Sequence, residues 1–167
     1  MTLEEKVTEQ WANVESQYQR RSDLIPNLVV TARSAADFEQ DLIDGLTNAA
    51  DAAKSVSEEL DNLDNEEQLN RFLDAQDVLG QRLRELLGQA GSKPTLRAME
   101  SFRDLQAQIE GTENRINTAR RDYNHAVNAY NTKLRRFPNS LFGVILGFDR
   151  KVPFESNASG DKPPGVG

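Results

Sequence analysis

The stretch FRDLQAQIEGTENRINTARRDYNHAVNAYNTKLRRF, residues 102–137, decides the fold. Within it an apolar residue recurs at every seventh position: Phe102, Ile109, Ile116, Tyr123, Tyr130 and Phe137. An ideal α-helix repeats every ~3.6 residues, so a strict seven-residue repeat over five heptads predicts long helices in coiled-coil-like contact. A chain built in this way is mostly helix seam and surface, with little room for an enclosed catalytic pocket.

The composition excludes several classes of protein. The 167 residues suit one domain with a real core. A net charge of −7 argues against general nucleic-acid binding, which needs a basic face to meet phosphates. Without cysteine the chain has no disulfide, thiolate nucleophile or cysteine metal site. The longest apolar run, LFGVILGF at 141–148, is much shorter than the ~20 residues of a membrane span.

The first part of the chain carries its own seven-residue register. Fourteen of its sixteen seam positions are apolar, and Arg21 and Glu39 are the exceptions. The sixteen positions are Val7, Trp11, Val14, Tyr18, Arg21, Ile25, Leu28, Ala32, Ala35, Glu39, Leu42, Leu46, Ala49, Ala53, Val56 and Leu60. The register passes through Pro26 without slipping, although proline disfavours a helix interior. Either one helix of 4–60 is kinked at Pro26, or a new helix begins near Ser22–Asp23, with Asp23 as its cap. We favour the kink, because no glycine-rich or polar loop lies there.

The remaining elements follow from periodicity and turn residues. We expect a turn at 61–67, a second helix at 66–88, a third helix at 95–137 that Pro138 follows, and a short apolar segment at 139–148. The prediction is an all-α protein, an elongated antiparallel bundle of long helices that resembles a four-helix bundle. It comprises one domain of residues 1–148 and a flexible Pro/Gly-rich tail of residues 149–167. Because the helices differ in length, we expect uncovered seams to self-associate or to meet a protein partner.

Two polar features lie on the predicted seams. Buried charges must be paired, so Arg21 and Glu39 should each have a partner across the interface. Alternatively, Arg21 marks the place where a partner or a phosphate enters. Asn117, Asn124 and Asn131 each follow a ladder residue, and asparagine is a poor helix former. We expect these amides to flank the core and fix the helix register through bonds to Gln17, Arg20, Arg21 or each other, with a ligand groove as the alternative.

Signals for catalysis or metal binding are weak. His125 is the only histidine, so a two-histidine metal site is excluded. Asp37, Asp41 and Asp44 share a helix face, but calcium sites need more irregular backbone to collect their ligands. We therefore predict no catalytic, cofactor-binding or metal-binding residues and no enzymatic activity.

Charge is segregated along the chain. Residues 37–67 hold eleven acidic side chains against one lysine, whereas residues 115–136 hold six basic side chains against one aspartate. Either both charged segments are solvated helix faces, or the basic segment meets an acidic surface such as anionic lipid. The apolar 139–148 segment, with Phe142, either covers the end of the bundle or inserts shallowly into an anionic membrane.

Three segments resemble signature segments of the LemA family of bacterial proteins. They are QYQRRSDLIPNLV at 17–29, TENRINTARRDYNHAVNAYNTKLRRFP at 112–138 and GF at 147–148. The resemblance implies a four-helix-bundle-like domain with no established enzymatic activity, usually preceded by a transmembrane helix and placed on the cytoplasmic side. Some family members are linked to magnetosome membranes or to bacterial signalling.

The residues and the resemblance together give a functional expectation. We expect a non-catalytic interaction or scaffold domain of the bacterial cell membrane, attached through an anchor that this polar-starting chain lacks and soluble as given. The alternative is a sensory or regulatory domain that binds a ligand near Arg20, Arg21 and Asp23 and transmits a change through Pro26. In either case Tyr123 and Tyr130 belong to the packed ladder, and Tyr123→Ala should be strongly destabilising.

Overall fold

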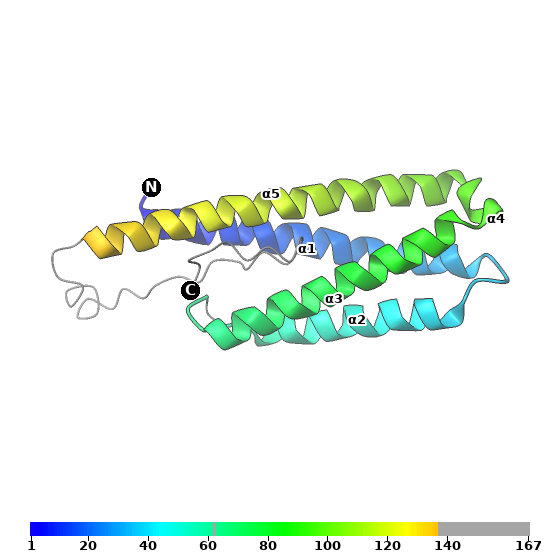
Figure 1. Ribbon diagram of the computed structural model, residues 1–167, viewed down its shortest axis with the longest axis horizontal. Helices are drawn as coiled ribbons and strands as arrows, with labels where there is room; N and C mark the ends of the chain where they lie inside the picture. Colours follow the sequence, from blue (N-terminus) through cyan, green and yellow to red (C-terminus); the bar gives the residue numbers. More distant parts are fainter. Residues whose placement is uncertain (62, 137–167) are drawn as a thin grey trace.

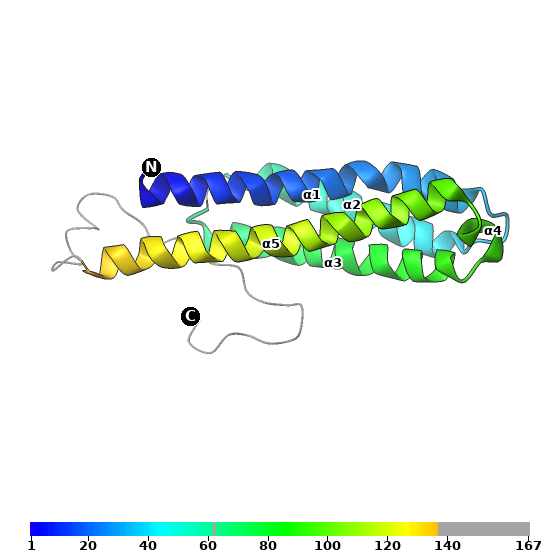
Figure 2. The same cartoon turned by 90° about the horizontal axis from the view of Figure 1, so that it is seen from above.

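The computed structural model describes residues 1–61 and 63–136, and this part of the chain is helical throughout apart from turns and caps (Figure 1). The helices are α1 (Leu3–Arg33), α2 (Gln40–Glu59), α3 (Glu66–Gly91), α4 (Pro94–Arg97) and α5 (Glu100–Arg136). The four long helices lie along a common direction and form an elongated rod, with α4 at one end (Figures 1 and 2).

The long helices associate as two pairs. α1 packs mainly along α5, and α2 packs mainly along α3, whereas α1 contacts α2 only sparsely. Both views show α1 and α5 side by side, with the start of α1 near the end of α5 (Figures 1 and 2). The rod is therefore two helix pairs joined along their inner faces.

The ends of these helices follow from local sequence. Thr2 and Glu5 form a capping box at the start of α1, in which each side chain accepts a hydrogen bond from the other residue's backbone N–H. The Asn65 side chain accepts a bond from the Gln68 N–H at the start of α3. Pro94 occupies the first turn of α4, where its missing N–H costs no helical hydrogen bond.

The core consists of two apolar clusters separated by a polar layer. One cluster holds Tyr18, Leu73 and Ile116 and their neighbours toward the start of α1, and the other holds Ile25, Leu79 and Ile109 and their neighbours toward α4. Between them lie three buried polar side chains, one from each of α1, α3 and α5: Arg21, Gln76 and Thr112. The polar layer thus crosses the rod near its middle.

The ladder prediction is confirmed for every member that the structure describes. Phe102, Ile109, Ile116, Tyr123 and Tyr130 are all buried on α5. Phe137, the 139–148 segment with Phe142, and the 149–167 tail lie outside the described residues.

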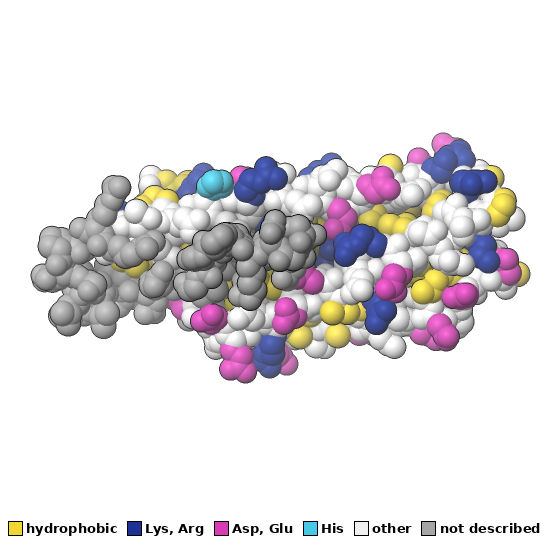
Figure 3. Space-filling model, viewed as in Figure 1, with side chains coloured by type: hydrophobic (Ala, Val, Ile, Leu, Met, Phe, Trp, Pro, Cys, Tyr) yellow, Lys and Arg dark blue, Asp and Glu magenta, His cyan; other side chains and the backbone are white. Residues whose placement is uncertain are grey.

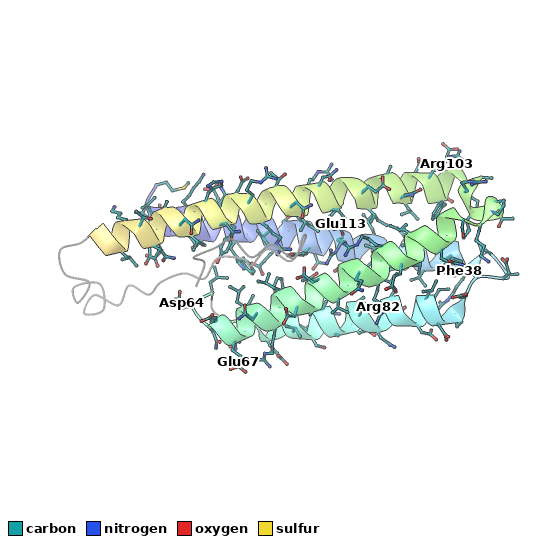
Figure 4. All side chains as sticks on the ribbon, in the orientation of Figure 1. Phe38, Asp64, Glu67, Arg82, Arg103 and Glu113 are labelled. Atoms are coloured by element: carbon teal, nitrogen blue, oxygen red, sulfur yellow. The ribbon has the colours of Figure 1, made fainter. Side chains whose placement is uncertain are left out.

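The first helix is continuous at Pro26, as we favoured, but its expected extent to residue 60 and the alternative start near Ser22–Asp23 are wrong. α1 runs through Ser22, Asp23 and Pro26 without a break, and it ends at Arg33 instead of continuing to residue 60. The chain turns at residues 34–39, where Ala35 and Phe38 are buried, and α2 begins at Gln40. Figure 4 shows Phe38 at this turn, at the end of the rod where α4 lies. The seam register continues from α1 into α2, so periodicity alone did not reveal the turn.

Two further expectations need correction. The helix expected at 95–137 is interrupted, because α4 ends at Arg97 and α5 begins at Glu100. Glu39 is exposed as the residue that precedes α2, instead of facing the core. Its charge therefore stays in water, and no partner across an interface is needed.

Replacing Tyr123 by alanine tests the packing of the ladder. The Tyr123 side chain is fully buried and lies against Trp11, with ring centroids 5.3 Å apart. We expect Tyr123→Ala to lower the free energy of unfolding by about 3 kcal/mol, the scale for emptying a large core position. Urea denaturation measures this change, with Asn128→Ala on the exposed side of α5 as the control. Equal midpoints for the two variants would contradict a packed ladder.

Candidate interaction groove

Arg21 on α1 is the centre of the polar layer. Its side chain is 3% exposed, and its Nη1 donates to Glu113 Oε1 on α5 at 3.0 Å. Its Nη2 donates to the backbone oxygen of Gln76 on α3 at 2.7 Å and to Gln76 Oε1 at 2.8 Å. Figure 4 shows Glu113 on the side of α5 that faces α3. The expected ionic partner of Arg21 is therefore confirmed, and one guanidinium group binds three helices together.

Two neighbours complete the surroundings of this guanidinium. It lies over the Tyr18 ring, 5.1 Å from the centroid, in a cation–π contact. Gly80 on α3 provides the space for it, because a Cβ atom there would lie 3.0 Å from Arg21 Nη1. A glycine in the middle of a helix has a conformational cost, and here the close approach of Arg21 explains its presence.

A groove runs between α1 and α2 on one side of this polar layer, where the two helix pairs are only sparsely in contact. It has a volume of about 940 Å³. Ile25 and Phe72 are buried beneath it, whereas Pro26 and Val30 line it as exposed side chains of α1. Gln76 also lines the groove, so the groove floor and the polar layer share a residue.

Burial perturbs two ionisable groups that line this groove. It raises the pKa of the Tyr18 hydroxyl, which the positive charge of Arg120 partly offsets. It also raises the pKa of the Glu15 carboxyl, which a hydrogen bond with the Trp11 side chain partly offsets. Both shifts thus follow from the partial burial of these side chains beside the groove.

The proposed ligand-binding residues of α1 lie in different surroundings. Arg21 is buried with partners on α3 and α5, Arg20 is exposed, and Asp23 accepts a hydrogen bond from Gln19 at 2.8 Å. Asp23 and Pro26 line the α1–α2 groove, whereas Arg20 does not.

The asparagine row also spans different surroundings. Asn117 is exposed and lines a second groove, of about 660 Å³, between α3 and α5. Asn124 is half-buried, and Asn131 is 5% exposed. The hydrogen bonds of Arg21 go to Gln76 and Glu113 and to none of these asparagines.

The sequence reasoning missed Gln76, Gly80 and Glu113 as members of the polar layer. Gly80 offered a signal, because an isolated glycine within a leucine-rich helix usually has a packing reason. Across residues 1–61 and 63–136, no three potential metal-ligating side chains come together. Within the same residues, no helix combines the length and apolarity that crossing a membrane requires.

Comparison with known proteins gives a consistent set of relatives. The LemA family model matches residues 10–167 of this chain. Magnetosome proteins MamQ 1 and MamQ 2 of Paramagnetospirillum magneticum are each 26% identical to it over 98% of the chain and 66% of their own length. Magnetosome protein MamQ of Magnetospirillum gryphiswaldense is 22% identical with the same coverage. The chain thus spans about two thirds of the length of these relatives.

A double-mutant cycle tests the contact between Arg21 and Gly80. Alanine in place of a helical glycine gains up to ~1 kcal/mol of stability from backbone propensity. We expect a larger gain for Gly80→Ala when Arg21→Met has removed the guanidinium, because in the wild-type background the new Cβ atom would lie 3.0 Å from Arg21 Nη1, the atom that donates to Glu113. Gly88→Ala on the same helix is the control, because a Cβ atom at Gly88 would meet nothing within 4 Å. It should change the stability equally in both backgrounds. An equal gain for Gly80→Ala in both backgrounds, measured by chemical denaturation, would refute the contact.

Proposed function

The chain belongs to the LemA family, and on this premise we propose that it is a non-catalytic scaffold module associated with the bacterial cell membrane. In this proposal the two helix pairs form an antiparallel four-helix bundle whose surface receives a protein partner or a second copy. The family resemblance suggests attachment to the membrane by an anchor and a position on the cytoplasmic side. The names of the MamQ relatives, magnetosome proteins, support a role in assembling a membrane-associated structure.

The observation that carries this proposal is the distribution of charge along the rod. Three basic side chains of α5, Arg115, Arg121 and Lys133, are exposed in a segment with a single acidic residue. The α2 helix and its flanking turns carry the opposite charge. In Figure 3 basic side chains appear along α5, with acidic ones among them toward the α4 end, and several acidic side chains and fewer basic ones lie over α2 and α3. A protein with net charge −7 can therefore still present a basic edge to an anionic surface.

This basic edge suits a lipid surface better than a nucleic acid. Each Lys or Arg near an anionic leaflet contributes about 1 kcal/mol of attraction, so a few exposed residues are sufficient to orient a module that an anchor already holds nearby. Nucleic-acid binding would need a larger basic footprint than a chain of this net charge supplies. We infer that α5 faces the membrane and that the opposite pair, α2 and α3, faces the cytoplasm.

Co-sedimentation with lipid vesicles tests this orientation. The full chain should sediment with phosphatidylserine-containing vesicles at low salt and stay in the supernatant with neutral vesicles. The triple variant Arg115→Glu, Arg121→Glu, Lys133→Glu should bind at least ~10-fold more weakly, given about 1 kcal/mol for each charge.

A matched control has the same change of net charge on the other part of the rod. The triple variant Arg71→Glu, Arg82→Glu, Arg97→Glu replaces three exposed side chains outside α5 and should retain most of the binding. If both triple variants lose vesicle binding equally, the binding depends on net charge alone and not on α5. Undiminished binding of the α5 variant would contradict the proposed orientation.

A further inference from the structure

We propose that the α1–α2 groove docks one amphipathic helix of a partner protein, with basic side chains along the polar edges of that helix. This inference rests on the proposed scaffold function and names the surface and the chemistry of the partner. It concerns a different part of the molecule from the basic edge of α5.

The dimensions of the groove suit a helix. Its α1 wall extends from Ala12 to Arg33, which corresponds to ~30 Å of helix, and its α2 wall extends from Thr47 to Glu58. Small residues, among them Ala12, Ser16 and Ala50, line both walls. Small side chains allow two helix backbones to approach closely, so a partner's helix can lie between α1 and α2.

An apolar strip within the groove can bury a partner's apolar face. Val30 on its lip is 69% exposed, which makes it the most exposed large apolar side chain of the described helices. Pro26, also exposed on this lip, extends the apolar surface by one turn. The buried side chains of Ile25 and Phe72 also line the groove, so a helix that covers the lip covers apolar side chains of the floor as well.

Gln76 supplies a hydrogen-bond donor to this floor. Arg21 can only donate, so it selects the amide oxygen of Gln76, and the amide NH₂ group is directed elsewhere. Although Gln76 is only 4% exposed, it lines the groove, and no partner for its NH₂ group is found among the hydrogen bonds of the described residues. A polar side chain of the docked helix can accept this bond, which would fix the position of the helix along the groove.

The charges around the groove define the partner's chemistry. Four acidic and two basic side chains line it: Glu15, Asp23, Asp51, Glu58, Arg33 and Lys54. Both walls contribute acidic residues, so a helix lying between them meets negative charge on both edges. Basic side chains along those edges would be complementary, whereas acidic ones would be repelled.

A designed peptide serves as the probe. It has 18 residues, with leucine and alanine on one face, an asparagine at the centre of that face and lysines along both edges; a second peptide has glutamate in place of every lysine. Fluorescence anisotropy of the labelled peptides is measured against the full chain. The lysine peptide should bind saturably, and the glutamate peptide should bind at least ~10-fold more weakly.

Two pairs of variants locate the binding. Val30→Lys on the lip should weaken binding of the lysine peptide about 10-fold, whereas Val78→Lys, at an exposed valine of α3 outside the groove, should leave it unchanged. Ala50→Phe places a large side chain in the groove and should abolish binding of the lysine peptide. Ala52→Phe, at an exposed position of the same helix outside the groove, should leave binding unchanged. Circular dichroism of each variant serves as the control that its helix content is unchanged.

Three results would overturn the inference: no saturable binding of the lysine peptide, equal binding by members of a variant pair, or preference for the glutamate peptide. Self-association of the wild-type chain that Val30→Lys abolishes, without peptide binding, would assign the groove to a second copy instead. Vesicle binding through α5 does not depend on Val30 or Ala50, so a failure here leaves the vesicle result intact and separates the two proposals.

Discussion

The buried guanidinium of Arg21 is the constraint on which the rest of the architecture depends. A charge that is removed from water must find partners or destabilise the fold. Arg21 finds them on two other helices, Gln76 on α3 and Glu113 on α5, and the Arg120–Asp77 contact at 3.4 Å adds a second link between α5 and α3. Apolar side chains can slide past one another at small cost, whereas these hydrogen bonds exist in one alignment only. The polar layer therefore fixes how the α1·α5 pair sits on the α2·α3 pair, as single polar residues fix register in coiled coils.

The same alignment connects the core to the surface that we propose as functional. Gln76 accepts a hydrogen bond from Arg21 on one side and lines the α1–α2 groove on the other. A helix that bonds to Gln76 would therefore bind next to the group that holds the two pairs together. Sparse contact between α1 and α2 leaves the groove open, and the bonds of Arg21 keep its floor in place. None of the basic residues proposed to meet the membrane, Arg115, Arg121 and Lys133 of α5, lines this groove, so membrane contact and partner binding can use different residues of one rod.

The sequence predicted the helical character and the packed ladder because a seven-residue repeat is a direct consequence of helix geometry. It failed at the turn of residues 34–39, where Ala35 and Phe38 are apolar and Leu42 resumes the register in phase. Glu39, a charge at a seam position, is a signal of that turn, although its place in the register predicts a buried residue. The sequence indicated that Arg21 needs a carboxylate, but it could not identify Glu113, because a partner 92 positions away depends on how the helices fold back. The groove could not be predicted from the sequence either, because it results from the spacing between helices and not from any motif.

Distance measurements between the two helix pairs test the central claim most directly. The chain has no cysteine, so Asn13→Cys on α1 and Ser55→Cys on α2 place spin labels at two exposed positions, one on each pair. Electron–electron double resonance then reports the distribution of distances between the pairs. Glu113 is 26% exposed and can be hydrated when its partner is removed, so Arg21→Met should leave the chain folded. We expect one narrow distribution with Arg21 and a broader or shifted one with Arg21→Met. An identical narrow distribution in both would contradict the claim that Arg21 fixes the arrangement of the two helix pairs.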